Sequence, residues 1–447
     1  MNILLFLFVA FLLLAEGYAL ARIVIQECHG MLLIGLALPL GAISNVLLFC
    51  LYTIVGIPLA ALWLLIGHCT ILATAVMIAR KRQPLPSPSA SLSQCSTMPR
   101  VYRCCCGVLL AVVFAFSAVH ALWLHSFAID SFTNWTMRSR ISFEDSAMAF
   151  DRTETRGVAK PQYPFLVHSL QIMANQGGAW RDRAANAITF LLSWSSLFAT
   201  FLMLKRLRGS DAALTGITLI AGIPLLSVHL AQGYGDIHLT TYLLLSLLSI
   251  ALYEETGERR WLTLCALTVL AALWTKSEGI FFGFLPWAVL SWMMAKRKGA
   301  LRSWGSNTAA VLLCFLPFLI LLYSKGLGFT PHDSDSSFAW HPEAIRIFFS
   351  SLLRFGSLGV TWYLAPAAVL LLALNHTDPP VHRSSFPLLL WPAAIVAMNA
   401  VIYLCTPNVA FLINGQSFAR QMMPASALLL AALILMIDWR GTETAAS

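Results

Sequence analysis

A polar stretch from residue 130 to residue 186 interrupts a chain that is otherwise rich in apolar segments, and it begins with an acid. This acid, Asp130, directly follows the apolar sequence HSFAI, so we expect it at a membrane surface. A carboxylate there is suited to act as a general base on a lipid headgroup. The alternative interpretation is a solvated acid or the N-cap of the next helix.

Further polar residues of the same stretch are candidates for binding a substrate. Arg138 and Arg140 follow Asp130 closely, and a guanidinium offers paired donors to phosphate oxygens. Lys160 and Tyr163, in KPQYP, are candidates for lining the entrance of an acceptor. The alternatives are solvated loop charges for the arginines and a rigid turn, favoured by the two prolines, for KPQYP.

The composition of the chain places these residues in an integral membrane protein. Of 447 residues, 58% are hydrophobic and 11% charged, and the mean hydropathy is +0.75. Segments of about 20 apolar residues can cross roughly 30 Å of hydrocarbon as helices. We therefore predict an all-α polytopic membrane protein with about 13 transmembrane helices. The predicted spans lie near residues 2–21, 31–50, 54–79, 105–127, 187–204, 212–232, 237–253, 261–275, 279–295, 307–324, 356–374, 386–405 and 421–438.

The distribution of Lys and Arg predicts which ends of the spans face the cytoplasm. Simple alternation of the spans places the basic connections KRLRGS, TGERR and AKRKGALR on one side, which the positive-inside rule assigns to the cytoplasm. The polar stretch and the turns GYGD and TKSEG then lie on the opposite, extracytoplasmic side.

The expected organisation has four parts. Residues 1–80 form an N-terminal group of three spans, and residues 81–104 a Pro/Ser-rich cytoplasmic linker. Residues 105–440 form the main membrane module, which includes an extracytoplasmic loop over residues 128–186, and residues 441–447 form a cytoplasmic tail.

Two segments on the extracytoplasmic side have the apolar spacing of helices that lie on a membrane. One is VHSLQIM, within the long loop, and the other runs over residues 342–355. Two such helices would roof a cavity over the bundle.

The outer side of a membrane restricts the chemistry that an enzyme can perform there. Nucleotide sugars and ATP are absent from this side, so a transferase must use a donor that is already activated and carried through the bilayer, typically a sugar on a polyprenyl phosphate. Such a reaction needs a base for the acceptor hydroxyl, cations for the phosphate and an apolar groove for the lipid.

Four segments in order resemble the glycosyltransferase C superfamily, particularly bacterial relatives of protein O-mannosyltransferases and of the lipid A aminoarabinose transferase. They are AIDSFTNWTMRSRISF, KPQYPFLVHSLQ, GYGDIHLTTYLLL and LAALWTKSEGIFF, and SFARQMMP before the last span is a weaker echo. The resemblance covers roughly residues 115–290. It implies a membrane glycosyltransferase that uses a lipid-phosphate sugar donor.

The resemblance also implies roles for individual residues. Asp130 resembles the first-loop aspartate that deprotonates the acceptor, and Asp236 resembles a second acid that positions the acceptor or a metal ion. Lys276 and Glu278 match a recurrent turn, although Ser277 stands where relatives often have Asn. Arg420 resembles a basic residue proposed to hold the lipid-linked phosphate.

Each of these residues also has a structural interpretation. Asp236 belongs to a glycine-rich turn, Lys276 and Glu278 are close enough to neutralise each other, and an isolated Arg420 could anchor a helix at the lipid interface. His168, His229 and His238 are too scattered in the sequence to propose a metal triad. Whether the two acids share a divalent metal ion is left open, and no other cofactor is predicted.

The sequence-based hypothesis is a single inverting displacement on the extracytoplasmic face, expected to be the periplasmic face of a bacterial inner membrane. Asp130 removes the acceptor proton, and Arg420, Lys276 and Arg138 hold the polyprenyl phosphate that leaves. The partners would be a polyprenyl-phosphate-linked sugar, membrane lipids and a lipid, glycan or protein acceptor, and not nucleic acid.

Two other classes of protein remain open. A transporter or flippase would place charges in the middle of its spans, where Glu16 is the main example in this chain. A polysaccharide polymerase or ligase would also have a large external loop with arginines.

Overall fold

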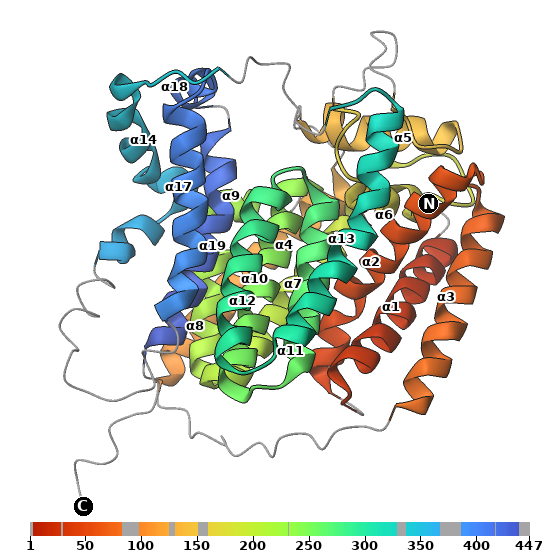
Figure 1. Ribbon diagram of the computed structural model, residues 1–447, viewed down its shortest axis with the longest axis horizontal. Coiled ribbons are helices and arrows are strands. Elements are labelled where there is room, and N and C mark those ends of the chain that lie inside the picture. Colours follow the sequence, from red (N-terminus) through yellow and green to blue (C-terminus); the bar gives the residue numbers. More distant parts are fainter. Residues whose placement is uncertain are drawn as a thin grey trace, which may run out of the picture.

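The computed structural model describes residues 3–27, 30–82, 98–124, 130–150, 160–230, 232–328, 337–366, 386–415 and 417–437. These residues form helices and turns, with no strand among them (Figure 1). Nine helices of the described part are long and apolar enough to cross a membrane. The described part is therefore all-helical, and the chain is a multi-pass membrane protein.

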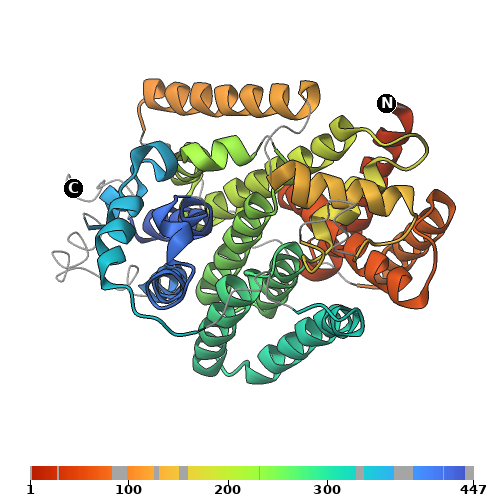
Figure 2. The same ribbon diagram turned by 90° about the horizontal axis from the view of Figure 1, so that it is seen from above.

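The nine candidate spans lie side by side in one bundle, and α10 at its centre is the most enclosed of them (Figures 1 and 2). They are α1 (Ile3–Ile25), α2 (Met31–Val55), α3 (Ala61–Lys81), α4 (Arg100–Trp123), α7 (Asp182–Arg208), α10 (Gly235–Thr256), α13 (Leu301–Ser324), α17 (Leu390–Leu404) with its preceding turn η4 (Phe386–Leu389), and α19 (Phe418–Met436). The shorter helices are η1 (Ser131–Thr136), α5 (Met137–Glu144), α6 (Leu166–Ala174), α8 (Ser210–Ala221), α9 (Pro224–His229), α11 (Arg259–Thr275), η2 (Ile280–Phe284), α12 (Leu285–Arg297), η3 (Pro342–Ala344), α14 (Ile345–Leu352), α15 (Phe355–Leu358) and α18 (Val409–Ile413).

The predicted count of about 13 spans is not confirmed by these nine candidates. The single span predicted over residues 212–232 is wrong, because two short helices, α8 and α9, occupy its place. The chain breaks between them at Gly222 and Ile223, just before Pro224, whose ring nitrogen cannot donate to a preceding helical turn. The span predicted over 356–374, most of the linker 81–104 and the tail 441–447 extend outside the described residues.

A proline inside α2 frees a backbone carbonyl that bonds to a neighbouring helix. Pro39 lies within α2 and leaves the carbonyl of Gly35 without its usual helical donor. The Ser195 hydroxyl of α7 donates to this oxygen at 2.9 Å, and the Tyr242 hydroxyl of α10 donates to the carbonyl of Pro39 at 2.9 Å. The N-terminal spans are thereby fixed to the centre of the bundle.

A carbonyl left free by a proline also connects the η2–α12 segment to α17. Pro286 stands near the start of α12 and deprives the Phe282 carbonyl of its partner four residues on. The backbone widens there into the π-helical turn η2, and the Trp391 indole N–H donates to the Phe282 oxygen at 2.6 Å. The proline therefore sets the position of a buried tryptophan on the neighbouring helix.

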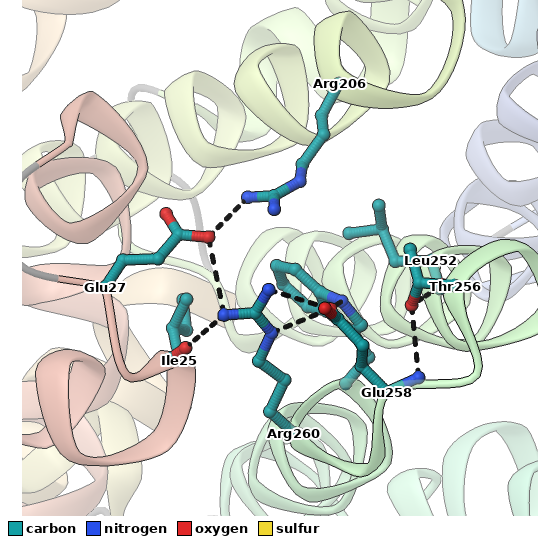
Figure 3. Close-up of polar contacts among 8 residues, drawn as sticks. Ile25, Glu27, Arg206, Leu252, Thr256, Glu258 and Arg260 are labelled. Carbon is teal, nitrogen blue, oxygen red and sulfur yellow. Dashed lines mark hydrogen bonds and ion pairs between the residues drawn. The ribbon is translucent and has the colours of Figure 1, made fainter. Parts of the chain in front are cut away.

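A buried charge cluster fastens three helices at one end of the bundle (Figure 3). The Glu27 carboxylate, just after α1, accepts from Arg206 of α7 at 2.7 Å and lies 3.6 Å from the Arg260 guanidinium of α11. Arg260 also donates to the Ile25 carbonyl at 2.6 Å, and both guanidinium groups lie over the Trp261 ring. The pairing satisfies charges that would otherwise be costly at this depth.

The segments predicted to lie on the membrane surface have different environments. The prediction is wrong for VHSLQIM, because every residue of α6 is buried between α2, α7 and the η1–α5 segment. An apolar stripe marks one buried face, and here the polar face of α6 is buried as well. In the second segment, α14 buries Phe348 and Leu352 and exposes Arg346, as an amphipathic helix does.

We predict that Glu27→Gln lowers the free energy of unfolding by about 3 kcal/mol, because it leaves two guanidinium groups without their shared carboxylate. Thermal or denaturant unfolding of the purified protein in detergent measures this change. Glu144→Gln is the matched control: its pair with Arg140 is about half exposed, and its loss should change stability by under about 0.5 kcal/mol. Equal effects of the two substitutions would contradict this role of Glu27.

Candidate active site

Asp130 and Arg420, 290 residues apart in the sequence, form an ion pair at one end of the bundle. Asp130 stands directly before η1, and Arg420 lies in the first turn of α19. The Asn134 amide donates to the second Asp130 oxygen at 3.2 Å. The side chains of Asp130 and Arg420 are 35% and 25% exposed, so both groups are accessible to a substrate.

A second charged group lies at the start of α10. The Lys276 ammonium group is 2.8 Å from an Asp236 oxygen and 3.0 Å from a Glu278 oxygen, and Lys276 and Asp236 are largely buried. Burial lowers the pKa of Lys276, but the two carboxylates raise it and prevail, so the pKa lies above its usual range. Lys276 is therefore a fixed positive charge.

Both groups belong to one site. Arg420 interacts electrostatically with Asp236 as well as with Asp130. The pKa of the Tyr163 phenol is affected by charges of both groups. Burial raises this pKa above the usual range, the Lys276 charge lowers it, and the carboxylates of Glu278, Asp236 and Asp130 raise it. The structure thus brings Asp130, Asp236, Tyr163, Lys276, Glu278 and Arg420 together, and their functional roles stay predictions.

Trp135 sets the distance between η1 and α10. Its ring stacks with the rings of Tyr163, at 5.1 Å between centroids, and of His168, at 5.3 Å, and its far edge meets the backbone of Gly235. A Cβ atom at Gly235 would lie 2.3 Å from the indole, so only glycine permits this contact. Because Asp236 is the next residue, the contact positions its carboxylate relative to η1.

Arg138 does not fit the expectation of a phosphate clamp. Its side chain is fully buried, and it donates to the chain's own carbonyls, at Ala149 over 3.0 Å and at Tyr163 over 2.6 Å. Phe150 and Phe165 lie against the guanidinium, and burial lowers its pKa to about 9. Arg138 therefore holds the loop together from inside.

Arg140 and Lys160, the other two cations proposed from this loop, have different environments. Arg140 is exposed and pairs with Glu144 one helical turn away, at 2.8 Å. Lys160 is partly buried at the start of the turn that leads to Tyr163, where its carbonyl accepts from the Tyr163 amide at 3.2 Å. Its proposed place at an acceptor entrance stays a prediction.

Sequence reasoning missed Tyr234 as a member of the site. The Arg420 guanidinium lies over its ring, 5.9 Å from the centroid, and the ring stacks on His229 at 4.4 Å. Burial raises the pKa of Tyr234 to about 12 and lowers that of His229 to about 4, so both are neutral near pH 7. The signal was present in the sequence, since Tyr234 is the aromatic residue of GYGD.

A divalent metal ion shared by the two acids does not fit this site. Asp130 is paired with Arg420, and Asp236 is paired with Lys276, which also takes an oxygen of Glu278. Cations thus already occupy the carboxylates that a metal would need. Within the described residues, no group of three or more His, Cys, Asp and Glu side chains could hold a metal ion.

Two crystal structures share the arrangement of helices described above. The crystal structure of ArnT from Cupriavidus metallidurans in the apo state matches with a TM-score of 0.54 and 16% identity, over 76% of this chain and 60% of that one. The same protein bound to undecaprenyl phosphate matches with a TM-score of 0.53 and 16% identity, over 73% and 59%. This chain has an ArnT-like fold.

The match to ArnT is one of structure. The chain spans about 60% of the length of the ArnT chain. No protein-family model and no curated protein sequence matches it. The likeness therefore establishes the ArnT-like fold, and the chemistry has to be argued from the site.

We predict that Gly235→Ala destabilises the protein by about 1–3 kcal/mol, because the new methyl group overlaps the Trp135 indole. Unfolding in detergent measures the loss. Gly107→Ala is the control, since a Cβ atom at Gly107 in α4 meets nothing within 4 Å. A Gly235→Ala protein as stable as the control would show that Trp135 does not set the spacing.

Proposed function

We propose that the protein is a membrane glycosyltransferase that moves a sugar from a polyprenyl-phosphate donor to an extracytoplasmic acceptor, with inversion. The observation that carries the proposal is the joining of two acid–cation pairs, Asp130 with Arg420 and Asp236 with Lys276, at one end of a membrane bundle. Acids and fixed cations side by side provide a base and a phosphate site together.

The distribution of charge supports an extracytoplasmic location for this site. Helix α10 runs from Asp236 at the site to Glu254 and Glu255 at the opposite end, where they pair with Arg297 and Arg208. The Glu27 cluster with its two arginines lies on the same side as that end of α10 (Figure 3). By the positive-inside rule the basic end faces the cytoplasm, so the site faces outward.

The fold and the sequence resemblance support the same donor class. ArnT is a glycosyltransferase of the GT-C superfamily, and one of its crystal structures contains undecaprenyl phosphate. The segments that resemble this superfamily supply Asp130, Asp236, Lys276 and Arg420 of the site. A lipid phosphate that leaves the sugar would meet two cations here.

The proposed reaction is one displacement. The acceptor hydroxyl gives its proton to an Asp130 oxygen while the acceptor oxygen attacks the anomeric carbon. The bond from that carbon to the phosphate oxygen breaks, its electron pair passes to the phosphate, and the polyprenyl phosphate leaves. Attack opposite the leaving group inverts the anomeric centre.

The cations stabilise the charge that develops on the phosphate. Arg420 offers a planar fork of donors, and Lys276 adds a buried positive charge that two acids keep protonated. Arg420 forms an ion pair with Asp130 in the structure. A phosphate that takes over the Arg420 donors would release the Asp130 carboxylate to accept the proton.

We predict that Asp130→Asn lowers transfer by at least about a hundredfold, because an amide cannot accept the acceptor proton. Glycolipid analysis by mass spectrometry of cells that lack the gene, complemented with the wild type or a variant, identifies the missing sugar and measures its transfer. Glu144→Gln, an exposed carboxylate on the same loop, is the control and should complement fully. Full complementation by Asp130→Asn would remove Asp130 as the base.

We predict that Arg420→Lys weakens binding of undecaprenyl phosphate about ten- to a hundredfold, because a lysine keeps the charge but loses the paired donors. Titration of the purified variant in detergent with this lipid measures the dissociation constant. Arg346→Gln, an exposed cation on α14, should leave it unchanged. If the two variants bind equally well, Arg420 does not hold the phosphate.

A further inference from the structure

A buried polar network connects the first three spans to α6. The Oε1 atom of Glu16 in α1 lies 2.8 Å from the Nδ1 atom of His68 in α3. The Ser44 hydroxyl of α2 donates to the Oε2 atom of Glu16 at 2.8 Å. The Nε2 atom of His68 lies 3.1 Å from the Oδ1 atom of Asn45 in α2, and the Asn45 amide donates to Ser169 of α6 at 2.8 Å. None of these groups belongs to the site described above.

Donor and acceptor counting fixes most of the protons in this network. Ser169 donates its hydroxyl to the Leu166 carbonyl at 2.9 Å, so it must accept from the Asn45 amide. The Asn45 oxygen then faces His68, whose Nε2 must carry a proton. One further proton lies between His68 and Glu16, so the pair is neutral as a whole whichever of the two holds it.

Such a group is costly within a membrane bundle. Glu16, Asn45, His68 and Ser169 have no solvent exposure, and removing one partner leaves another buried polar atom unsatisfied. Apolar side chains of similar volume would pack with no such cost. Such a network does specify how the helices pack, because its hydrogen bonds are satisfied in only one relative placement of the helices.

Close packing of α1 on α2 further restricts how these two helices can be placed relative to each other. A Cβ atom at Gly17 would lie 1.6 Å from the Ala37 carbonyl oxygen, and one at Gly41 would lie 2.1 Å from the Leu13 oxygen. These glycines flank the network, since Gly17 adjoins Glu16 and Gly41 precedes Ser44 by three residues. The backbones of α1 and α2 are therefore in contact beside the hydrogen bond between Glu16 and Ser44.

The far end of the network reaches the segment that carries the site. Helix α6 has nine residues, too few to be stable alone, so its position depends on its partners. His168 stacks on Trp135 and lies 2.9 Å from the Ser139 hydroxyl, which donates to Gln171 at 2.6 Å. A shift of α6 would therefore move Trp135, and with it the spacing between Asp130 and Asp236.

We propose that Glu16, His68 and Asn45 are positioning residues for the transfer site, acting through Ser169 and α6 on Trp135. The inference rests on the proposed function, and it gives the first three spans a part in the reaction. Arg420 and Lys276 lie outside α6. We therefore expect the network to affect the rate of transfer, through the spacing between Asp130 and Asp236, much more than binding of the lipid phosphate.

The test compares kcat for transfer with the dissociation constant for undecaprenyl phosphate in purified variants. Asn45→Leu keeps a similar volume and breaks the link to Ser169, and Glu16→Leu breaks it at His68. Each should lower kcat about ten- to a hundredfold, since a misplacement near 1 Å can cost that much, with the dissociation constant within about twofold. Thr53→Val is the control: this α2 hydroxyl donates to its own helix, at Phe49, over 2.7 Å.

Glu16→Gln separates positioning from a proton-carrying role. The glutamine amide can donate to Nδ1 of a neutral His68, and its oxygen can accept from Ser44, so every hydrogen bond is kept. We expect kcat within about threefold of the wild type. A Glu16→Gln protein as slow as Glu16→Leu would overturn the inference, because the carboxylic proton itself would then be required.

Four other results bear on the inference or on the proposed function. It fails if Asn45→Leu and Glu16→Leu transfer at the wild-type rate, or if kcat and lipid binding fall together in proportion to the folded fraction. Should the leucine variants not fold, Ser169→Ala, which removes one hydroxyl, must lower kcat without loss of lipid binding. A wild-type protein that transfers no sugar contradicts the proposed function instead, whereas an active wild type matched by Asn45→Leu contradicts this inference alone.

Discussion

The pairing of charges across long sequence distances organises the end of the bundle where the site lies. An unpaired ion at a membrane boundary or below it is costly, so Asp130, directly before η1, and Arg420, in the first turn of α19, are stable there as partners. Asp130 with Arg420, and Asp236 with Lys276, meet this requirement. The same pairs leave one carboxylate and one guanidinium partly exposed, and a reaction on a lipid phosphate needs both.

The sequence predicted the members of this site better than the details around them. The sequence places four charged residues at the boundaries of apolar segments: Asp130, Asp236, Lys276 and Arg420. Alternation of the spans puts these boundaries on one side of the membrane. The broken span at Pro224 and the buried α6 were not predicted, because an apolar stretch looks alike whether it crosses the membrane or ends within the protein. Arg138 was misjudged because its acceptors are backbone carbonyls 11 and 25 residues away, which no motif reveals.

The N-terminal spans are built into the bundle rather than attached to its edge. Hydrogen bonds at Gly35 and Pro39 connect α2 to α7 and α10, the Glu27 cluster connects the end of α1 to α7 and α11, and the buried network reaches α6. From the sequence alone, a charge in the middle of a span such as Glu16 is typical of a transporter. In the structure Glu16 bonds to His68 of α3 and Ser44 of α2, so we infer that it positions helices.

A structure of the protein with undecaprenyl phosphate bound tests the central claim most directly. The account predicts phosphate oxygens within about 3 Å of the Arg420 guanidinium and close to Lys276, with Asp130 turned away from Arg420. A phosphate bound elsewhere, with the pair between Asp130 and Arg420 intact, would contradict it.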